Sequence, residues 1–242
     1  MRVAVISDIH GNYHALEAVL AEVTAECPDE IWCLGDTVGY GPEPNRCCES
    51  VARHADLCLA GNHDLAAIGA LSIDDFNGDA GAALHWTQTA LSDDARRFLE
   101  PLAPAANRRG AGLYHGSPID PVWDYVLSEE GVRASMNATP EQLVLVGHSH
   151  VSLQISYDSG TLGGGLAGES QEIDLDTSRW LLNPGSVGQP RGGDPRAAWL
   201  LLDLEAGCAS FRRTSYPIDR TQAEIRAAGL PEALATRLAL GQ

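Results

Sequence analysis

An aspartate and a histidine stand two positions apart directly after the first apolar run of the chain. The run covers residues 3–7, and Asp8 and His10 follow it. In an extended segment residues i and i+2 point to the same side, so the two side chains are able to meet at one point. A carboxylate and an imidazole at one point are ligands that a divalent metal ion needs. The pattern is weak by itself, because such a pair is usually a turn residue beside a surface histidine.

Four further units of the same kind favour a metal centre. In each, polar residues follow an apolar stretch: they are Gly35-Asp36, Gly61-Asn62-His63-Asp64, Tyr114-His115-Gly116 and Gly147-His148-Ser149-His150. Five of the eight histidines lie in the five units. The other three, His14, His54 and His85, fall in helix-like stretches and are interpreted as surface or partly buried groups.

The units together supply oxygen and nitrogen donors and no thiolate. The candidate ligands are Asp8, His10, Asp36, Asn62, His115, His148 and His150. Such donors suit Mn²⁺, Fe, Zn²⁺ or Ni²⁺ better than a soft metal. The set exceeds what one ion uses, and two ions that share a bridging carboxylate sit roughly 3.5 to 4 Å apart. That separation suits an in-line phosphoryl displacement.

Apolar strands and helices alternate around these units. Residues 3–7, 31–34 and 56–59 are predicted strands, and Asn12 is the predicted N-cap of a helix. Because the strands are apolar throughout, the pattern predicts a sheet buried on both faces. Such sheets bind their ligands at the carboxyl ends of the strands, where the polar units stand.

The later part of the chain continues this pattern. Residues 78–99 are predicted to be helical and to cover one sheet face, with Ser92 as an N-cap signal. Further strands are predicted at residues 112–115, 143–146, 151–157, 180–182 and 197–203, the last in a hairpin with 208–211. The glycine-rich residues 160–168 match no phosphate-binding glycine motif, so they are predicted to form a mobile surface connection.

Length and composition indicate one domain over residues 1–242, with a helical C-terminal tail from about residue 219. The chain is 44% hydrophobic and 20% charged, as in ordinary soluble proteins. No apolar run approaches the roughly 20 residues of a membrane span, and the first run ends at Asp8, too early for a signal peptide. We therefore expect a cytoplasmic protein without a membrane partner.

Charge and cysteine content narrow the range of partners. The formal net charge of -17 argues against bulk nucleic-acid binding, which depends on clusters of Lys and Arg. An anionic substrate would instead be attracted locally, and bound cations would do this. The six cysteines show no C-x-x-C spacing, so reduced thiols are expected rather than a zinc ribbon or a redox motif. The oligomeric state does not follow from the sequence.

The five units, taken in order, resemble the signature of the calcineurin-like metallophosphoesterase superfamily. The resemblance covers about residues 1–215, and residues 39–45 and 183–191 are similar to its small prokaryotic branch. It implies a four-layer α-β-β-α sandwich with two mixed central sheets. The implied function is that of a dinuclear metal-dependent phosphoesterase that hydrolyses small phosphoesters through attack by a metal-activated water.

The resemblance also implies roles for single residues. One ion would be held by Asp8, His10, Asp36 and His150, and the other by Asp36, Asn62, His115 and His148, so that Asp36 bridges them. Both would be divalent transition-metal ions, with Mn expected and Fe, Zn or Ni open. His63 would face the substrate as a cation or acid. Asp64 completes the motif, either as a catalytic residue or as a loop Asp that caps an amide.

Two positions bear on the substrate, which is expected to be a small phosphoester. Protein Ser/Thr phosphatases and symmetrical dinucleoside tetraphosphatases normally carry an Arg four positions after the Gly-Asp aspartate, whereas this chain has Tyr40, preceded by Gly39. A hydroxyl and an aromatic face suit a monoanionic diester better than a dianionic monoester. Arg191 is either a phosphate contact or an exposed residue of a structured turn.

Other functions remain in competition. Within the superfamily they are a phosphomonoesterase, a Ser/Thr protein phosphatase and a dinucleoside polyphosphate hydrolase. A non-catalytic scaffold on the same fold is disfavoured because every signature position is filled. A metallo-β-lactamase is disfavoured because Val151-Ser152-Leu153 follows the His-x-His unit, where that family continues with x-Asp-His.

Overall fold

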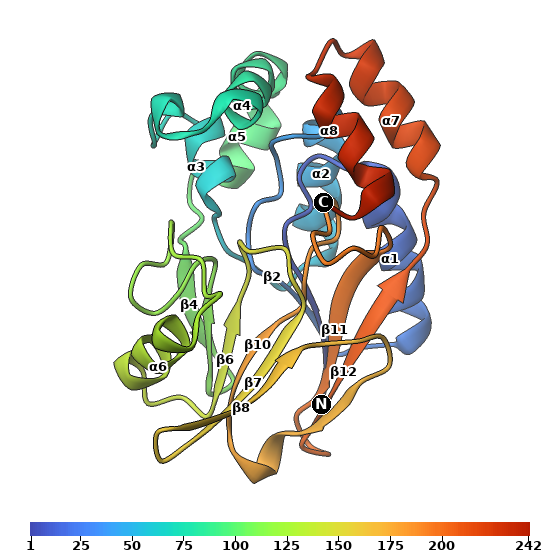
Figure 1. Ribbon diagram of the computed structural model, residues 1–242. Coiled ribbons are helices and arrows are strands. Elements are labelled where there is room, and N and C mark those ends of the chain that lie inside the picture. The colour runs from blue at the N-terminus through green and yellow to red at the C-terminus, as the bar shows by residue number, and fades with distance from the viewer.

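Two mixed six-stranded sheets form the centre of the computed structural model, which describes residues 1–242 (Figure 1). The first sheet has the order β3, β2, β1, β11, β12, β9, with the bounds β1 (Arg2–Ile6), β2 (Glu30–Cys33), β3 (Leu57–Cys58), β9 (Glu172–Asp174), β11 (Ala197–Asp203) and β12 (Cys208–Thr214). The second has the order β4, β5, β6, β10, β7, β8, with the bounds β4 (Ala105–Arg108), β5 (Ala111–Tyr114), β6 (Leu143–Val146), β7 (Leu153–Asp158), β8 (Thr161–Leu166) and β10 (Arg179–Asn183). Strand β1 runs parallel to β2 and antiparallel to β11, and β10 runs parallel to β6 and antiparallel to β7. The predicted pair of mixed sheets is therefore confirmed.

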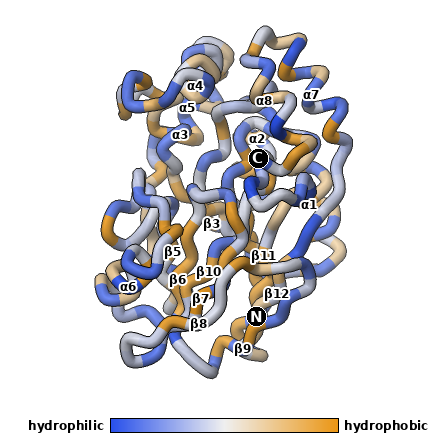
Figure 2. Tube along the Cα trace, viewed as in Figure 1, coloured by the Kyte–Doolittle hydropathy of each residue, from blue (hydrophilic) through white to orange (hydrophobic).

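The alternation of side chains along β1 shows how the layers stack. Val3 and Val5 are buried between the sheets, in a core that includes Leu113 of the second sheet. Ala4 and Ile6 point the other way and pack with the helices that cover the first sheet. The strands are apolar along both faces because both faces are covered, as their hydrophobic colouring in Figure 2 illustrates.

Helices on the outer faces complete four layers. α1 (Tyr13–Glu26) and α2 (Pro44–His54) cover the first sheet, and α6 (Glu129–Ala138) covers the second. This arrangement confirms the predicted α-β-β-α sandwich. No helix has the length and apolar content that a bilayer crossing requires.

Asn12 caps α1, as predicted from the sequence. Its Oδ1 accepts a hydrogen bond from the backbone N of Ala15 at 3.2 Å. The same side chain donates to the backbone O of Gly188 at 2.9 Å and accepts from Thr221 Oγ1 at 3.0 Å. One residue therefore fixes the start of the helix and joins it to two segments distant in the sequence.

The predicted helix over residues 78–99 is two helices, α4 (Gly78–Ala90) and α5 (Asp93–Leu99). Ser92 caps the second, because its Oγ accepts from the backbone N of Ala95 at 3.2 Å. The expectation that this segment covers a sheet face was wrong. Its apolar residues pack mainly on α2 and on α3 (Asn62–Ala67), because α2 already covers that part of the first sheet.

The glycine-rich residues 160–168 also differ from their prediction as a mobile connection. They contain β8, which pairs antiparallel with β7 over its whole length at the edge of the second sheet. A sheet ladder is made by backbone groups, which glycine supplies as well as any other residue. The prediction of a mobile connection, which was based on glycine content, was therefore wrong.

The chain ends in α7 (Ile218–Ala227), α8 (Glu232–Thr236) and a final 3₁₀ turn, Arg237–Leu240, so the predicted helical tail is observed. Ile225, Leu234 and Leu238 pack with Ala83 of α4. Figure 1 shows α4, α7 and α8 gathered at one end of the sheets. This is the end to which the polar signature units belong.

Glu30 joins the two sheets at the opposite end. Its Oε2 accepts hydrogen bonds from Arg108 Nε at 2.6 Å and Trp32 Nε1 at 2.7 Å, and its Oε1 accepts from Arg109 Nη2 at 2.7 Å. The hydrogen bond from Arg108, helped by those from Arg109 and Trp32, lowers the pKa of Glu30 to about 2. The carboxylate is therefore a charged link between β2 and the β4–β5 turn.

Replacing Glu30 with glutamine should lower the free energy of unfolding at pH 7 by about 1.5 to 3 kcal/mol, the usual contribution of hydrogen bonds to a charged group. The folded-state pKa lies below the unfolded value of 4.5. The stabilisation is therefore complete above pH 4.5 and is lost as the pH falls toward 2. Urea titrations between pH 7 and pH 3 should show the deficit narrowing below pH 4.5, and the exposed Glu17→Gln is the control. A constant deficit would contradict this account.

Candidate metal centre

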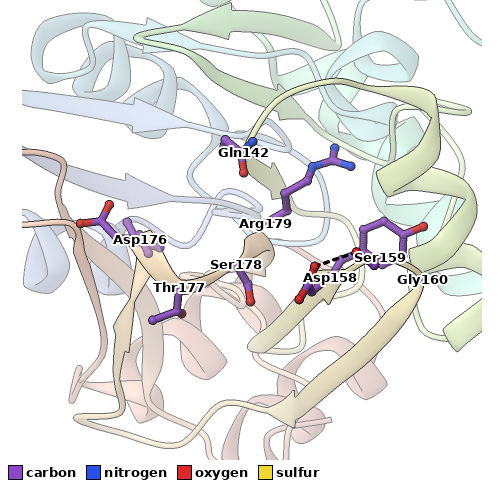
Figure 3. A pocket seen from close by; sticks show the side chains of 10 residues that line it. Gln142, Asp158, Ser159, Gly160, Asp176, Thr177, Ser178 and Arg179 are labelled. Carbon is purple, nitrogen blue, oxygen red and sulfur yellow. Dashed lines mark hydrogen bonds between the residues drawn. The ribbon is translucent and has the colours of Figure 1, made fainter.

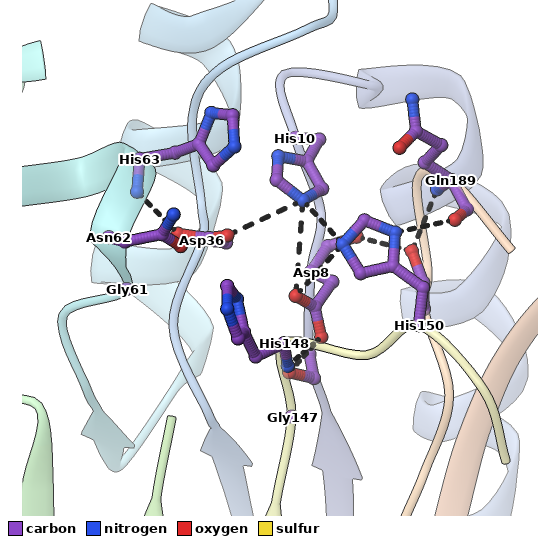
Figure 4. Close-up of polar contacts among 12 residues, drawn as sticks. Asp8, His10, Asp36, Gly61, Asn62, His63, Gly147, His148, His150 and Gln189 are labelled. Carbon is purple, nitrogen blue, oxygen red and sulfur yellow. Dashed lines mark hydrogen bonds and ion pairs between the residues drawn. The ribbon is translucent and has the colours of Figure 1, made fainter. Parts of the chain in front are cut away.

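The signature units meet at one end of the sheets. All the predicted ligands lie there, and none is more than 3% exposed: Asp8, His10, Asp36, Asn62, His115, His148 and His150. Figure 4 labels all of them except His115. Six of them fall into two groups, and within each group all ligand atoms lie within 4.8 Å of one another. The first group is Asp8, His10, Asp36 and His150, and the second is Asp36, His115 and His148. Asn62 Oδ1 lies 3.2 Å from His115 Nε2. Asp36 belongs to both groups.

Five of these residues adopt a left-handed backbone conformation, with φ between 51° and 61°: Asp8, His10, Asp36, His148 and His150. This region is unfavourable for residues other than glycine, and such residues concentrate at functional sites. Here the left-handed conformation turns the backbone sharply after each strand. The sequence correctly predicted that Asp8 and His10 meet, but it predicted an extended backbone, whereas both residues are left-handed.

Three histidines share one hydrogen-bonding pattern. Each Nδ1 lies against a backbone carbonyl oxygen: His10 with Val38 at 3.2 Å, His115 with Leu34 at 2.9 Å and His150 with Gln189 at 2.7 Å. A carbonyl only accepts, so Nδ1 carries the hydrogen and Nε2 of the neutral ring presents a lone pair. His10 Nε2 and His150 Nε2 nevertheless lie 3.0 Å apart. Two facing lone pairs at this distance are suited to a cation between them.

The two carboxylates each keep one buried oxygen without a hydrogen bond, Asp8 Oδ1 and Asp36 Oδ2. Asp8 Oδ1 lies 3.3 Å from His150 Nε2. Asp36 Oδ2 lies 3.5 Å from His10 Nε2 and 3.4 Å from His115 Nε2, so it stands between the two groups. Leaving such oxygens buried and unpartnered is costly, and a metal ion would remove that cost.

The pKa shifts of these residues also fit a bound divalent metal ion. Burial raises the pKa of Asp36, as do the nearby carboxylates of Asp64 and Asp8, so a charged Asp36 needs a cation. Burial lowers the pKa of His115 and His150, and it lowers that of His148 to about 2. Neutral imidazoles and unpaired carboxylate oxygens are the forms that bind divalent metals, so the donor set fits them.

His63 stands beside these groups without belonging to either. Its ring lies 4.8 Å from that of His10 and 4.4 Å from that of Tyr40, centroid to centroid, and its Nδ1 is buried without a partner. A Cβ at Gly39 would approach His63 Nδ1 to 2.4 Å, and Gly39 has a φ of +92°. Glycine at position 39 therefore makes room for the imidazole.

Asp64 contacts backbone rather than the centre. Its Oδ1 accepts from the N of Val38 and its Oδ2 from the N of Gly61, both at 3.0 Å. Burial raises the pKa of Asp64 to about 6. These bonds hold the Asp36 loop against the start of α3, so we interpret Asp64 as a positioning residue. Its direct catalytic role stays an untested prediction.

Gly61 allows the two loops to approach. A Cβ at this position would lie 1.9 Å from Asp36 Oδ1, the oxygen that accepts from the backbone N of His63 at 2.9 Å. The glycine of this unit is therefore required by packing against the carboxylate.

The loop after β10 supports the Asp8 and His148 turns from behind. Asn183 donates to the backbone O of Gly147 at 2.7 Å, and Ser186 Oγ donates to the backbone O of Asp8 at 2.7 Å. The sequence pointed to this loop only by resemblance, because most of these contacts are with backbone atoms, which leave no pattern in the sequence.

Tyr40 and Arg191 both lie beside the donor groups, and their contact with a substrate stays a prediction. The Tyr40 ring is 4.6 Å from the His10 ring. Arg191 donates through its backbone N to the O of His150 at 3.2 Å, and its side chain donates to Gln189 Oε1 at 3.0 Å. After burial, the charge of Arg191 is the next cause that lowers the pKa of His150.

Two further side chains lie beside the donor groups that the sequence did not predict. The half-exposed Tyr125 lies with its ring 3.9 Å from the ring of His148. Arg237, near the C-terminus, places Cζ 4.4 Å from the centroid of the Tyr40 ring. Neither belongs to a recognisable motif, so no local signal in the sequence marks them.

The largest surface pocket lies elsewhere. It is lined by residues such as Gln142, Asp158, Asp176 and Arg179, at the other ends of β6 and β10 from the signature units (Figure 3). It contains none of the clustered donors. The chemistry of the donors, rather than cavity size, therefore locates the candidate site.

Comparisons with known proteins agree with this geometry. The calcineurin-like phosphoesterase superfamily domain matches residues 1–207. A metallophosphoesterase from Sphaerobacter thermophilus has a similar crystal structure, with a TM-score of 0.90 and 41% identity over 100% of this chain and 99% of that one. An uncharacterized protein from Methanocaldococcus jannaschii is 36% identical over 99% of this chain and 98% of its own length. A symmetrical bis(5'-nucleosyl)-tetraphosphatase from Erwinia tasmaniensis is 29% identical over 55% of this chain and 50% of its own length.

Proposed function

The chain belongs to the calcineurin-like phosphoesterase superfamily, whose members hydrolyse phosphoesters, and we propose that it is a dinuclear metal-dependent hydrolase of small phosphodiesters. One observation carries the proposal. Asp36 Oδ2 is unpartnered and lies 3.4 to 3.5 Å from Nε2 of one histidine in each donor group. A carboxylate oxygen in that position suits a bridge between two divalent ions.

The proposed ligands follow the two donor groups. Asp8, His10, Asp36 and His150 would hold one ion, and Asp36, His115, His148 and Asn62 the other. Two bound divalent ions, with Mn expected, would lower the pKa of the attacking water and neutralise charge on the phosphoryl oxygens. A metal analysis near two ions per chain would support this, whereas a chain without metal would favour a scaffold.

The chain's own residues would bind and orient the ester. His63 would donate a hydrogen bond or a proton to a phosphoryl or leaving-group oxygen. Arg191, which lies beside His150, would bind the phosphate, and Tyr40 would offer its hydroxyl and ring. Asp64 would hold the loop after Asp36 against the start of α3, and Gly61 leaves room for the Asp36 carboxylate.

A dinucleoside polyphosphate hydrolase is the second candidate. It is favoured by the similarity to symmetrical tetraphosphatases. The matched region covers about half the length of those proteins. Tyr40 distinguishes this chain from them at the position where they normally carry an arginine.

Bis-p-nitrophenyl phosphate should be hydrolysed with a kcat/KM at least about 10-fold above that of a phosphoserine peptide, because the missing bidentate arginine contact is worth about 1.5 to 3 kcal/mol to a dianion. The assay is run with Mn²⁺, Ni²⁺ and Mg²⁺ in parallel, and diadenosine tetraphosphate is included. Efficient release of phosphate from the peptide with little diester cleavage would overturn the substrate assignment. Preferential cleavage of the tetraphosphate would favour the second candidate.

A further inference from the structure

Arg237 is a partly buried cation that forms no ion pair. Its Nε and Nη2 are buried and make no hydrogen bond, and its Cζ lies 4.4 Å from the centroid of the Tyr40 ring. Buried N–H donors of a charged group that lack a partner are destabilising, so such a group usually serves a ligand. The chain has a net charge of -17, so carboxylates that could pair with an arginine are abundant in it. Its isolation therefore calls for a functional explanation.

The C-terminal helices bring Arg237 close to the metal centre. A small pocket is lined jointly by His10 and Tyr40 from the centre and by Ile225, Leu234 and Leu238 from the C-terminal segment. Leu234 and Leu238 flank Arg237 in the sequence and are buried in one cluster with Ile225. This packing sets the backbone of Arg237 beside the site, where its guanidinium contacts Tyr40.

Arg237 lies against Tyr40 rather than against the donor groups. Its contact is with Tyr40, whose ring is 4.6 Å from the ring of His10, and it makes no hydrogen bond or ion pair with any clustered residue. Arg191 instead contacts the backbone of His150 directly. Arg191 thus contacts a donor group directly, whereas Arg237 reaches one only through the Tyr40 ring.

We propose that Arg237 is a substrate-binding residue that holds a second, non-scissile phosphate group, as in a nucleoside diphosphate moiety. The inference rests on the proposed function and narrows its substrates to phosphoesters with more than one phosphate. A planar fork of unused N–H donors matches phosphate oxygens bidentately. The Tyr40 ring on which it stacks holds the fork in place and keeps its charge partly desolvated.

Titration calorimetry with ADP and AMP tests this, since the two probes differ by one phosphate. The protein is saturated with Mn²⁺, and free metal is buffered in both titrations. The unmodified protein should bind ADP at least about 10-fold more tightly than AMP, the minimum expected of one charge-assisted contact. Arg237→Met should abolish this preference by weakening ADP much more than AMP, and Arg237→Lys should restore part of it. The exposed Arg220→Met on α7 is the control and should retain the preference.

Thermal unfolding provides a second readout. Because Arg237 carries unpaired buried donors, Arg237→Met should leave the Tm unchanged or raise it, whereas a structural arginine would lower it when removed. Equal affinity for ADP and AMP in the unmodified protein, or an equal loss of both with a lowered Tm in Arg237→Met, would overturn the proposal. Because calorimetry does not require turnover, this result is independent of whether bis-p-nitrophenyl phosphate is hydrolysed, which tests the proposed function separately.

Discussion

Replacing Asp36 with asparagine should reduce phosphoester hydrolysis to background and lower the amount of bound metal. The unpartnered Oδ2 of Asp36 lies between His10 Nε2 and His115 Nε2, at 3.5 and 3.4 Å. A neutral amide in this position removes the negative charge that two cations would share. No neighbouring carboxylate can take its place, because Asp8 belongs to only one donor group and Asp64 is bonded to backbone amides.

The measurement is metal content by mass spectrometry together with turnover of bis-p-nitrophenyl phosphate in excess Mn²⁺. Asp158→Asn, exposed at the opposite end of the sheet, is the matched control and should behave as the unmodified protein. The fold should survive in Asp36→Asn, because the asparagine Oδ1 is still able to accept from the backbone N of His63. Full metal content with near-normal turnover would remove Asp36 from the bridging position.

The sequence predicted which side chains meet but not how they are oriented. Asp8, Asp36 and His115 were found because each follows an apolar strand, and the ends of neighbouring strands meet at one edge. The carbonyl groups of Leu34, Val38 and Gln189 that orient the histidines carry no such signal, because every residue has one.

The same limit applies to the fold. Local periodicity located the helices over residues 78–99, but it could not specify that they pack on α2 and α3 instead of on a sheet. Composition described residues 160–168 as a connection, although β8 is held by its backbone pairing with β7. Arg237 lies outside the segment that matches the family, residues 1–207, and reaches the site only through tertiary packing.

His63→Asn should lower kcat by roughly 10²- to 10⁴-fold, the usual contribution of a positioned acid or base. Metal content should be retained, because His63 belongs to neither donor group. Burial lowers the pKa of His63, so its imidazole is neutral in the free protein at pH 7. An anionic phosphate beside the unpartnered Nδ1 would raise that pKa and allow the ring to take up a proton with the substrate.

The dependence on leaving group decides between the two roles of His63. A p-nitrophenolate needs little protonation to leave, whereas an alkoxide needs a proton, so the loss in His63→Asn should be larger for an alkyl ester. The measurement is kcat for matched p-nitrophenyl and alkyl diesters, with His85→Asn on the exposed face of α4 as the control. Equal losses for both esters would leave His63 as a hydrogen-bond donor to the phosphoryl oxygens and remove its role as the acid. In either case Gly39 matters, because any side chain there would occupy the space of the imidazole.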